Sequence, residues 1–234
     1  MIQVLILSAI AGGMIPLGAL LAQWEDLQPH WLEDEFRHAV IAFGAGALLA
    51  AVAFVLVPDG SEKVAAWSAP LWLLAGGITM GGVNRLIARS GNAPGQFIAM
   101  LTDFLPEVMA LGALAAVGEP STMLLAGLIA LQNLPEGFNA FRERQDQTNA
   151  SSGRIMREFC ALAVLGPFGA VLGYVYFAER PAHLGAMMLL AAGAILYLMF
   201  QDIAPQVRLK RSWLPPLGAI AGMSLGLAGH LILG

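Results

Sequence analysis

The sequence predicts an all-α integral membrane protein with eight transmembrane helices. Hydrophobic residues make up 58% of the 234-residue chain, charged residues make up only 12%, and the mean hydropathy is +0.71. A soluble domain has about a quarter of its residues charged, so this chain has too few charges to cover a water-facing surface. Its apolar residues also gather in runs of about 20, the length that crosses a bilayer as a helix.

Turn-rich or charged segments separate the apolar runs and define the spans in order. The first run has no basic region ahead of it and no convincing cleavage site after it, so we interpret it as a helix and not as a signal peptide. The segments that follow the first to the seventh span are, in order, WEDLQPHWLEDEFR, PDGSEK, RSGNAPG, VGEPS, RERQDQTNASSGRIMR, ERPA and PQVRLKRS. A single transmembrane domain over residues 1–234 is expected, with spans 1–22, 38–57, 67–87, 97–117, 121–141, 157–178, 183–204 and 214–233.

The distribution of Lys and Arg predicts the orientation. The odd-numbered connections carry ten of these residues, whereas the even-numbered connections carry two, Lys63 and Arg180. Because positive charges stay in the cytoplasm, we expect a multi-pass protein of the cell (inner) membrane with both termini extracellular or periplasmic. The ten are Arg37, Arg85, Arg89, Arg142, Arg144, Arg154, Arg157, Arg208, Lys210 and Arg211.

Two stretches of the chain echo each other. Residues 46–58 read GALLAAVAFVLVP and residues 193–205 read GAILYLMFQDIAP, so both begin with Gly-Ala and reach a proline at the same distance. In the orientation above, the first stretch runs outward and the second runs inward. This arrangement predicts an inverted repeat, a common plan among transporters.

A second pair of matching motifs lies in the fourth and fifth spans. Asp103 precedes Glu107 by four residues, Gln132 precedes Glu136 by four, and both motifs end in Leu-Pro-Glu. Residues four apart share one helix face, and the short connection makes the two helices neighbours, so these oxygens are expected to converge. A charge inside a bilayer costs about 3 kcal/mol or more unless a proton or a cation neutralises it, and carboxylate and amide oxygens suit divalent cations. The alternative is that the prolines are ordinary kinks and the glutamates are protonated packing residues.

The fifth-span run QNLPEG, residues 132–137, resembles the His-Asn-x-Pro-Glu-Gly motif of the ZIP (Zrt/Irt-like) divalent-metal transporters. In that family the motif occurs on the fourth and fifth of eight helices, and the termini are extracellular. The resemblance implies a ZIP-like bundle. Other runs agree with the family's second, sixth and seventh helices: FGAG with Leu48-Leu49 and Pro58-Asp59, GPFGA at 166–170 with Gly173-Tyr174, and Ala192-Gly193 with Leu196-Tyr197 and Pro205.

The chain departs from the family at the site itself. The fourth-helix His-Asn positions are Asp103 and Phe104, and the fifth-helix histidine position is Gln132. Carried over by position, the resemblance implies one principal metal site made by Asp103, Glu107, Gln132 and Glu136.

A second, adjacent metal site of binuclear family members loses two of its ligands here. Its fourth-helix asparagine is Phe104 and its sixth-helix glutamate is Gly166, which leaves Asn133 with the shared Glu107 and Glu136. We therefore expect one bound metal ion. Because the site has no histidine, Mn²⁺ or Fe²⁺ is expected to be preferred to Zn²⁺.

The sequence thus predicts a transporter that moves Zn, Mn or Fe toward the cytoplasm, with the divalent ion as substrate and no prosthetic group. A metal-binding sensor or degenerate relative that does not transport is the alternative. An enzyme is not expected, since the spans contain no nucleophile–base pair and no His-Glu-x-x-His motif. The expected partners are the lipid membrane and divalent metal ions; a nucleic acid is excluded because no basic stripe with aromatic residues is present, and a homodimer is left open.

Overall fold

The computed structural model contains helices and no strand over the residues that it describes, 1–25, 33–90, 95–147, 150–206 and 213–233. Three segments have the wider π-helical turn and continue an α-helix. In chain order the elements are α1 (Ile2–Glu25), α2 (Glu33–Ala51), η2 (Val52–Leu56), α3 (Val57–Glu62), α4 (Ala69–Ser90), α5 (Gly95–Val117), α6 (Ser121–Gln147), α7 (Ser152–Leu172), η3 (Gly173–Phe177), α8 (Pro181–Leu198), η4 (Met199–Ile203), α9 (Ala204–Gln206) and α10 (Leu214–Leu233).

Each predicted span coincides with one of these helices or with a helix extended by a π segment. The largest difference is at α6, which continues to Gln147 and not to residue 141. Three other helix ends differ by five residues: α2 begins at Glu33 and not at 38, α3 ends at Glu62 and not at 57, and α7 begins at Ser152 and not at 157. The extensions of α2 and α6 are polar turns, in which helical hydrogen bonds continue after the apolar run has ended. Arg208, Lys210 and Arg211, which contribute to the predicted orientation, lie outside the described residues.

Six helices are long and apolar enough to cross a membrane when only the described residues are considered, which is consistent with an all-α multi-pass membrane protein. The helices α4 and α6 are not among them. In α6 the reason is its row of polar side chains, several of which are buried inside the protein and do not face the surroundings. The six stretches are Ile2–Trp24, Glu35–Glu62, Met100–Val117, Ser152–Phe177, Pro181–Gln201 and Leu214–Leu233.

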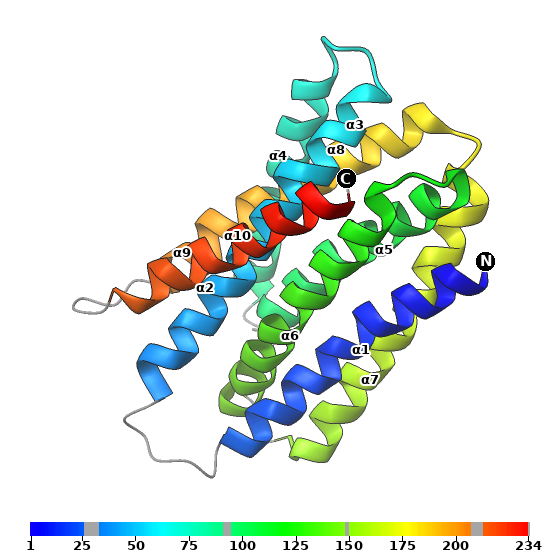
Figure 1. Cartoon of the computed structure of the whole chain (residues 1–234). Helices are drawn as coiled ribbons and strands as arrows, with labels where there is room; N and C mark the ends of the chain where they lie inside the picture. The colour runs from blue at the N-terminus through cyan, green and yellow to red at the C-terminus, as the bar shows by residue number, and fades with distance from the viewer. Residues whose placement is uncertain (26–32, 91–94, 148–149, 207–212, 234) are drawn as a thin grey trace.

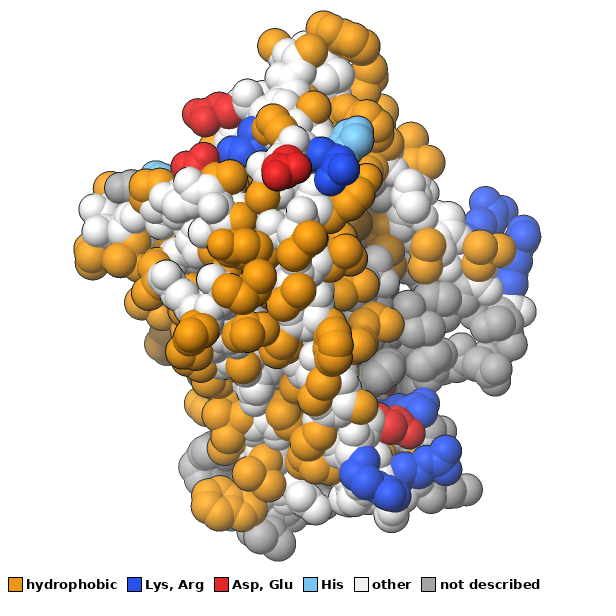
Figure 2. All heavy atoms as spheres, turned by 90° about the vertical axis from the view of Figure 1, so that its right-hand side faces the viewer, with side chains coloured by type: hydrophobic (Ala, Val, Ile, Leu, Met, Phe, Trp, Pro, Cys, Tyr) orange, Lys and Arg blue, Asp and Glu red, His pale blue; other side chains and the backbone are white. Residues whose placement is uncertain are grey.

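The surface agrees with this assignment. On the face drawn in Figure 2, hydrophobic side chains cover the middle, whereas charged side chains gather at the two ends and along one edge. Successive long helices run in opposite directions, and the N- and C-termini lie at the same end of the bundle (Figure 1). The connections α3–α4, α5–α6 and α7–α8 lie at that end as well.

Small residues hold the helices of one group together, namely α1, α5, α6 and α7. A Cβ atom on Gly18 of α1 would overlap the carbonyl oxygen of Leu134 in α6, and one on Gly112 of α5 would overlap the carbonyl oxygen of Ala170 in α7. Such close backbone approach is the main way in which helices associate in lipid, where the hydrophobic effect does not drive them together.

A second group contains α2, α4, α8 and α10. Gly46 of α2 lies against the backbone of Ala219 in α10, and Gly193 of α8 lies against the backbone of Leu73 in α4. The two groups meet chiefly where α2 packs on α6 and α5 packs on α8. At the α2–α6 contact, a Cβ atom on Gly44 would lie 2.6 Å from Cγ of Pro135.

The π segments η2 and η4 occupy equivalent places in the two echoing stretches. The segment η2 begins at Val52, after Gly46, and η4 begins at Met199, after Gly193, at the same separation. Each is followed by its proline, Pro58 or Pro205. A proline lacks the N–H that would close the preceding α-turn, so a change of helical geometry before it is expected. π segments within α-helices often mark functional sites.

Candidate metal site

The helices α5 and α6 form a hairpin that carries all the predicted ligands. Gly118 ends α5 with a left-handed backbone (φ 75°), and the N–H of Glu119 donates to the carbonyl of Leu114 at 3.0 Å, which is a glycine-type helix end. The next helix begins at Ser121. Both helices continue through their internal prolines, Pro106 and Pro135.

The structure brings Glu107 and Gln132 into direct contact. Both residues are fully buried, and Gln132 Nε2 donates to Glu107 Oε2 at 2.5 Å. This bond joins the polar faces of α5 and α6, as expected if i, i+4 pairs on two neighbouring helices face each other.

Asp103 and Glu136 lie beside this contact. Asp103 is 7% exposed, and its Oδ1 accepts the backbone N–H of Phe104 at 2.7 Å. Asp103 repels Glu107, and Glu136 repels both of these carboxylates when all are ionised. Over the described ranges, no three His, Cys, Asp or Glu side chains converge closely enough to hold an ion by themselves. An ion at this place would therefore need the amide oxygens too, or a small closure of the hairpin.

Several oxygens of this cluster are buried without a hydrogen-bond donor among the described residues. The five atoms are Glu107 Oε1, Gln132 Oε1, Asn133 Oδ1, and Oε1 and Oε2 of Glu136. A buried polar group without a partner costs about 1–3 kcal/mol, and native proteins contain few of them. A cation ligated by several of these oxygens would remove that cost, so the donor set fits a divalent ion.

Asn133 is held by α1 and not by α5. Its Nδ2 donates to the carbonyl oxygen of Ala11 at 2.8 Å, and the residue is 1% exposed. Nearby, Gly137 of α6 lies against the backbone of Ile15. The helix α1 thus supports the side of α6 next to the glutamate.

Phe104 fills the place next to Gly166. Its side chain is fully buried, and a Cβ atom on Gly166 would lie 2.9 Å from Cζ of its ring. A Cβ atom on Gly12 of α1 would lie 3.2 Å from the same atom. The large residue on α5 and the small residue on α7 are therefore complementary in shape, and an apolar ring fills the space between these two helices beside Asp103.

Two further polar residues extend the site, and the sequence prediction did not include them. Asn139 of α6 is 2% exposed and continues the face of Gln132 and Glu136 by one turn. Arg37 of α2 donates from Nη2 to Asn139 Oδ1 at 3.2 Å. The i, i+4, i+7 spacing of the α6 residues was a usable signal for Asn139, whereas nothing in the sequence pairs it with Arg37.

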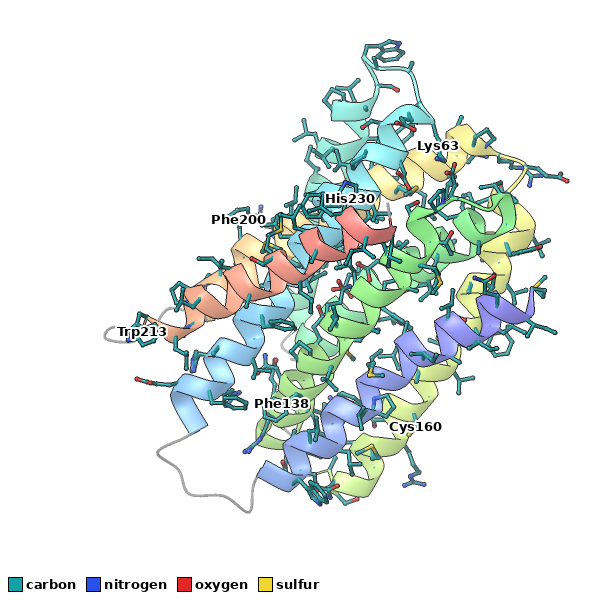
Figure 3. All side chains as sticks on the ribbon, in the orientation of Figure 1. Lys63, Phe138, Cys160, Phe200, Trp213 and His230 are labelled. Carbon is teal, nitrogen blue, oxygen red and sulfur yellow. The ribbon has the colours of Figure 1, made fainter. Side chains whose placement is uncertain are left out.

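At the end that holds the termini, polar contacts join α3 to the hairpin. Ser121 donates from Oγ to Asp59 Oδ2 at 2.6 Å, and Nζ of Lys63 lies 3.7 Å from Glu119 Oε1. Figure 3 shows Lys63 at this end, whereas Trp213 lies at the opposite end. These residues are separate from the buried cluster.

Comparison of the chain with models of known protein families finds no match, and comparison with curated proteins finds no relative. The class of the protein therefore follows from its fold and site alone. It is a multi-pass helical membrane protein with a buried cluster of carboxylate and amide oxygens between two central helices.

Proposed function

We propose that this protein is a divalent-cation transporter of the ZIP kind, which moves metal across the cell membrane toward the cytoplasm. The observation that carries the proposal is the set of buried oxygens without partners on Glu107, Gln132, Asn133 and Glu136. A protein that only needed a packed core at this place would gain stability from apolar residues of the same shape. The presence of these buried oxygens is explained if they bind an ion during transport.

The proposed architecture has eight spans, with α4 and α6 completing the six apolar helices. Two observations support it. Both termini lie at the same end of the bundle, which requires an even number of crossings if every long helix crosses (Figure 1). Several polar residues that lower the hydropathy of α6, Gln132, Asn133 and Asn139 among them, are buried inside the protein, so lipid does not contact them.

An inverted repeat relating α1, α2 and α4 to α7, α8 and α10 is also part of the proposal. The π segments at equivalent positions support it, and so do the helix contacts. Under this correspondence α2 against α10 becomes α8 against α4. If α5 and α6 also exchange places, α1 against α6 becomes α7 against α5, and all four contacts are present. Such repeats provide alternating access by movement of one bundle against another around a central site.

Transport follows from these parts. Metal binding requires the carboxylates to be deprotonated, so Glu107 and Glu136 would release protons when the ion arrives and take them up when it leaves. We propose one ion per chain, because Phe104 fills the neighbouring space against Gly166. The all-oxygen ligand set favours Mn²⁺ or Fe²⁺ over Zn²⁺. No covalent chemistry is needed, so the protein is not an enzyme in this proposal.

A metal sensor that binds an ion without transporting it is the second candidate. It is favoured by the dispersed acidic groups, since no three of the described His, Cys, Asp and Glu residues are gathered around one point. A sensor would bind metal in detergent but would not carry it into vesicles.

The test is uptake of radioactive Mn²⁺ into proteoliposomes by the wild type, Glu136→Gln and Glu119→Gln. The two substitutions make the same chemical change, but Glu119 lies in the α5–α6 connection with a 41% exposed side chain. We expect uptake by the wild type and by Glu119→Gln, and none by Glu136→Gln. Metal binding without uptake by the wild type would establish the sensor, and uptake by Glu136→Gln equal to that of the wild type would overturn the proposed site.

A further inference from the structure

The polar face of α6 continues inward beyond the proposed metal site. Gln132, Glu136 and Asn139 follow each other at intervals of four and three residues, so their side chains form one stripe along the helix. The two amides are almost completely buried, and Asn139 is 2% exposed. An ion that leaves Glu136 along this stripe would meet Asn139 next.

A small cavity lies between Glu136 and Asn139. Its volume is about 20 Å³, and a cavity needs roughly 10–15 Å³ to hold one water molecule. It can therefore take a single water or a dehydrated ion, but nothing larger. Three helices enclose it, and the lining residues are Ile41, Gly44, Ala45, Pro135, Glu136, Asn139 and Ile203.

Arg37 is bound to Asn139, one of the residues that line this cavity. Its Nη2 donates to Asn139 Oδ1 at 3.2 Å, which links α2 to α6 across 102 residues of sequence. Arg37 and Ile41, which lines the cavity, are four residues apart and therefore lie on the same face of α2. Its Nε is also buried and has no hydrogen-bond partner among the residues described.

We propose that Asn139 Oδ1 is the next ligand on the inward path of the cation and that Arg37, bound to this oxygen, is the lock that closes the path. This inference rests on the proposed function, in which Glu136 holds the cation. In the locked state a positive guanidinium both occupies the oxygen that the ion would use and repels the ion. The path opens when α2 and α6 separate enough for Arg37 to leave Asn139. The packing of α2 on α6 is one of the two main contacts between the helix groups.

A hydrogen bond from Arg37 to Asn139 could also have only a structural role. The test must therefore measure access to the cavity and not stability alone. Cys160 is the one cysteine of the sequence and is exposed, so its replacement by Ser leaves a chain without thiols. Ala45→Cys then places a thiol in the cavity wall. A small, membrane-impermeant methanethiosulfonate reagent, added from the side of the α2 N-terminus, reports whether the cavity is open.

We expect slow modification of this thiol while Arg37 is present, and modification at least tenfold faster with Arg37→Met. Arg37→Gln, which keeps a donor but removes the charge, provides a second variant should the first fold poorly. The matched control is Arg154→Met, because Arg154 has a 68% exposed side chain and pairs only locally, with Glu158 at 3.5 Å. A rate unchanged in both folded Arg37 variants would overturn the lock.

Uptake of Mn²⁺ tests the role of Asn139. In the Arg37→Met background, where the lock is already removed, we expect Asn139→Ala to lower the maximal rate several-fold with a nearly constant half-saturating concentration, because the ion reaches Asn139 only after it has bound at Glu136. An unchanged maximal rate would overturn the ligand role. Absence of uptake by the wild type would refute the proposed transport, and with it the ligand role, whereas the thiol assay uses no metal and reports on the lock separately.

Discussion

Two adjacent glycines of α1 offer a sharp test of the packing that supports the site. A Cβ atom on Gly12 would lie 2.7 Å from the carbonyl oxygen of Ala163 in α7 and 3.2 Å from Cζ of Phe104 in α5. A Cβ atom on Gly13 would meet no atom within 4 Å. Gly12→Ala and Gly13→Ala therefore add the same methyl group one residue apart, against a backbone in one case and into open space in the other.

The two substitutions are expected to change the free energy of unfolding in different directions. Ordinary contact begins at 3.4 Å, so Gly12→Ala requires α1 and α7 to separate by about 0.7 Å, which is 3.4 minus 2.7. Overpacking of this kind costs about 1–3 kcal/mol. Gly13→Ala should be neutral or stabilising by about 0.5–1 kcal/mol, because glycine is unfavourable in a helix interior. The displacement at Gly12 also acts next to Ala11, whose carbonyl holds Asn133.

Thermal unfolding of the two variants in the same detergent measures this difference. One kcal/mol shifts the melting temperature of a chain of this size by about 2–4 °C, so Gly12→Ala should melt about 2–12 °C below the wild type. Gly13→Ala should melt at or above the wild-type temperature. Equal melting temperatures for the two variants would refute the close approach of α1 and α7 at this point.

Two further substitutions test the site. Phe104→Ala removes a fully buried ring and should lower the free energy of unfolding by about 3–5 kcal/mol, measured by the same unfolding assay. A decrease below about 1 kcal/mol would contradict the role of this ring in filling the core. Asp103→His adds an imidazole nitrogen beside Glu107, so competition assays should show a shift of preference toward Zn²⁺ relative to Mn²⁺. An unchanged preference would mean that Asp103 does not determine the selectivity.

Much of the helical framework could be predicted from the sequence, because a helix that faces lipid must be apolar along a bilayer's thickness. A helix that is enclosed by other helices can carry polar residues, because those residues do not contact lipid. In α6, which carries Gln132 and Asn133, the polar residues lower the hydropathy, and the Leu-Pro-Glu pattern is the clearer signal there. The residues that come together at Glu107 and Gln132 could be inferred because they depend only on helical spacing and a short connection.

Other features depend on tertiary contacts that no local pattern contains. The echo of residues 46–58 and 193–205 was visible in the sequence, but the π segments within it were not, since they depend on how the backbone adjusts to its neighbours. The bond from Arg37 to Asn139 joins residues that are far apart in the chain. The packing of the Phe104 ring against Gly166 likewise requires α5 and α7 to be neighbours, which their order in the chain does not determine.

Equilibrium binding of Mn²⁺ to the purified protein in detergent tests the central claim most directly, namely that the buried oxygens of the α5–α6 hairpin hold a divalent cation. The wild type and the Glu119→Gln control should each bind one ion per chain. Glu136→Gln should bind at least about 100-fold more weakly, because even the outer partners of metal ligands contribute about 10–100-fold to affinity. Binding by Glu136→Gln with wild-type affinity, or no saturable binding by the wild type, would contradict the account.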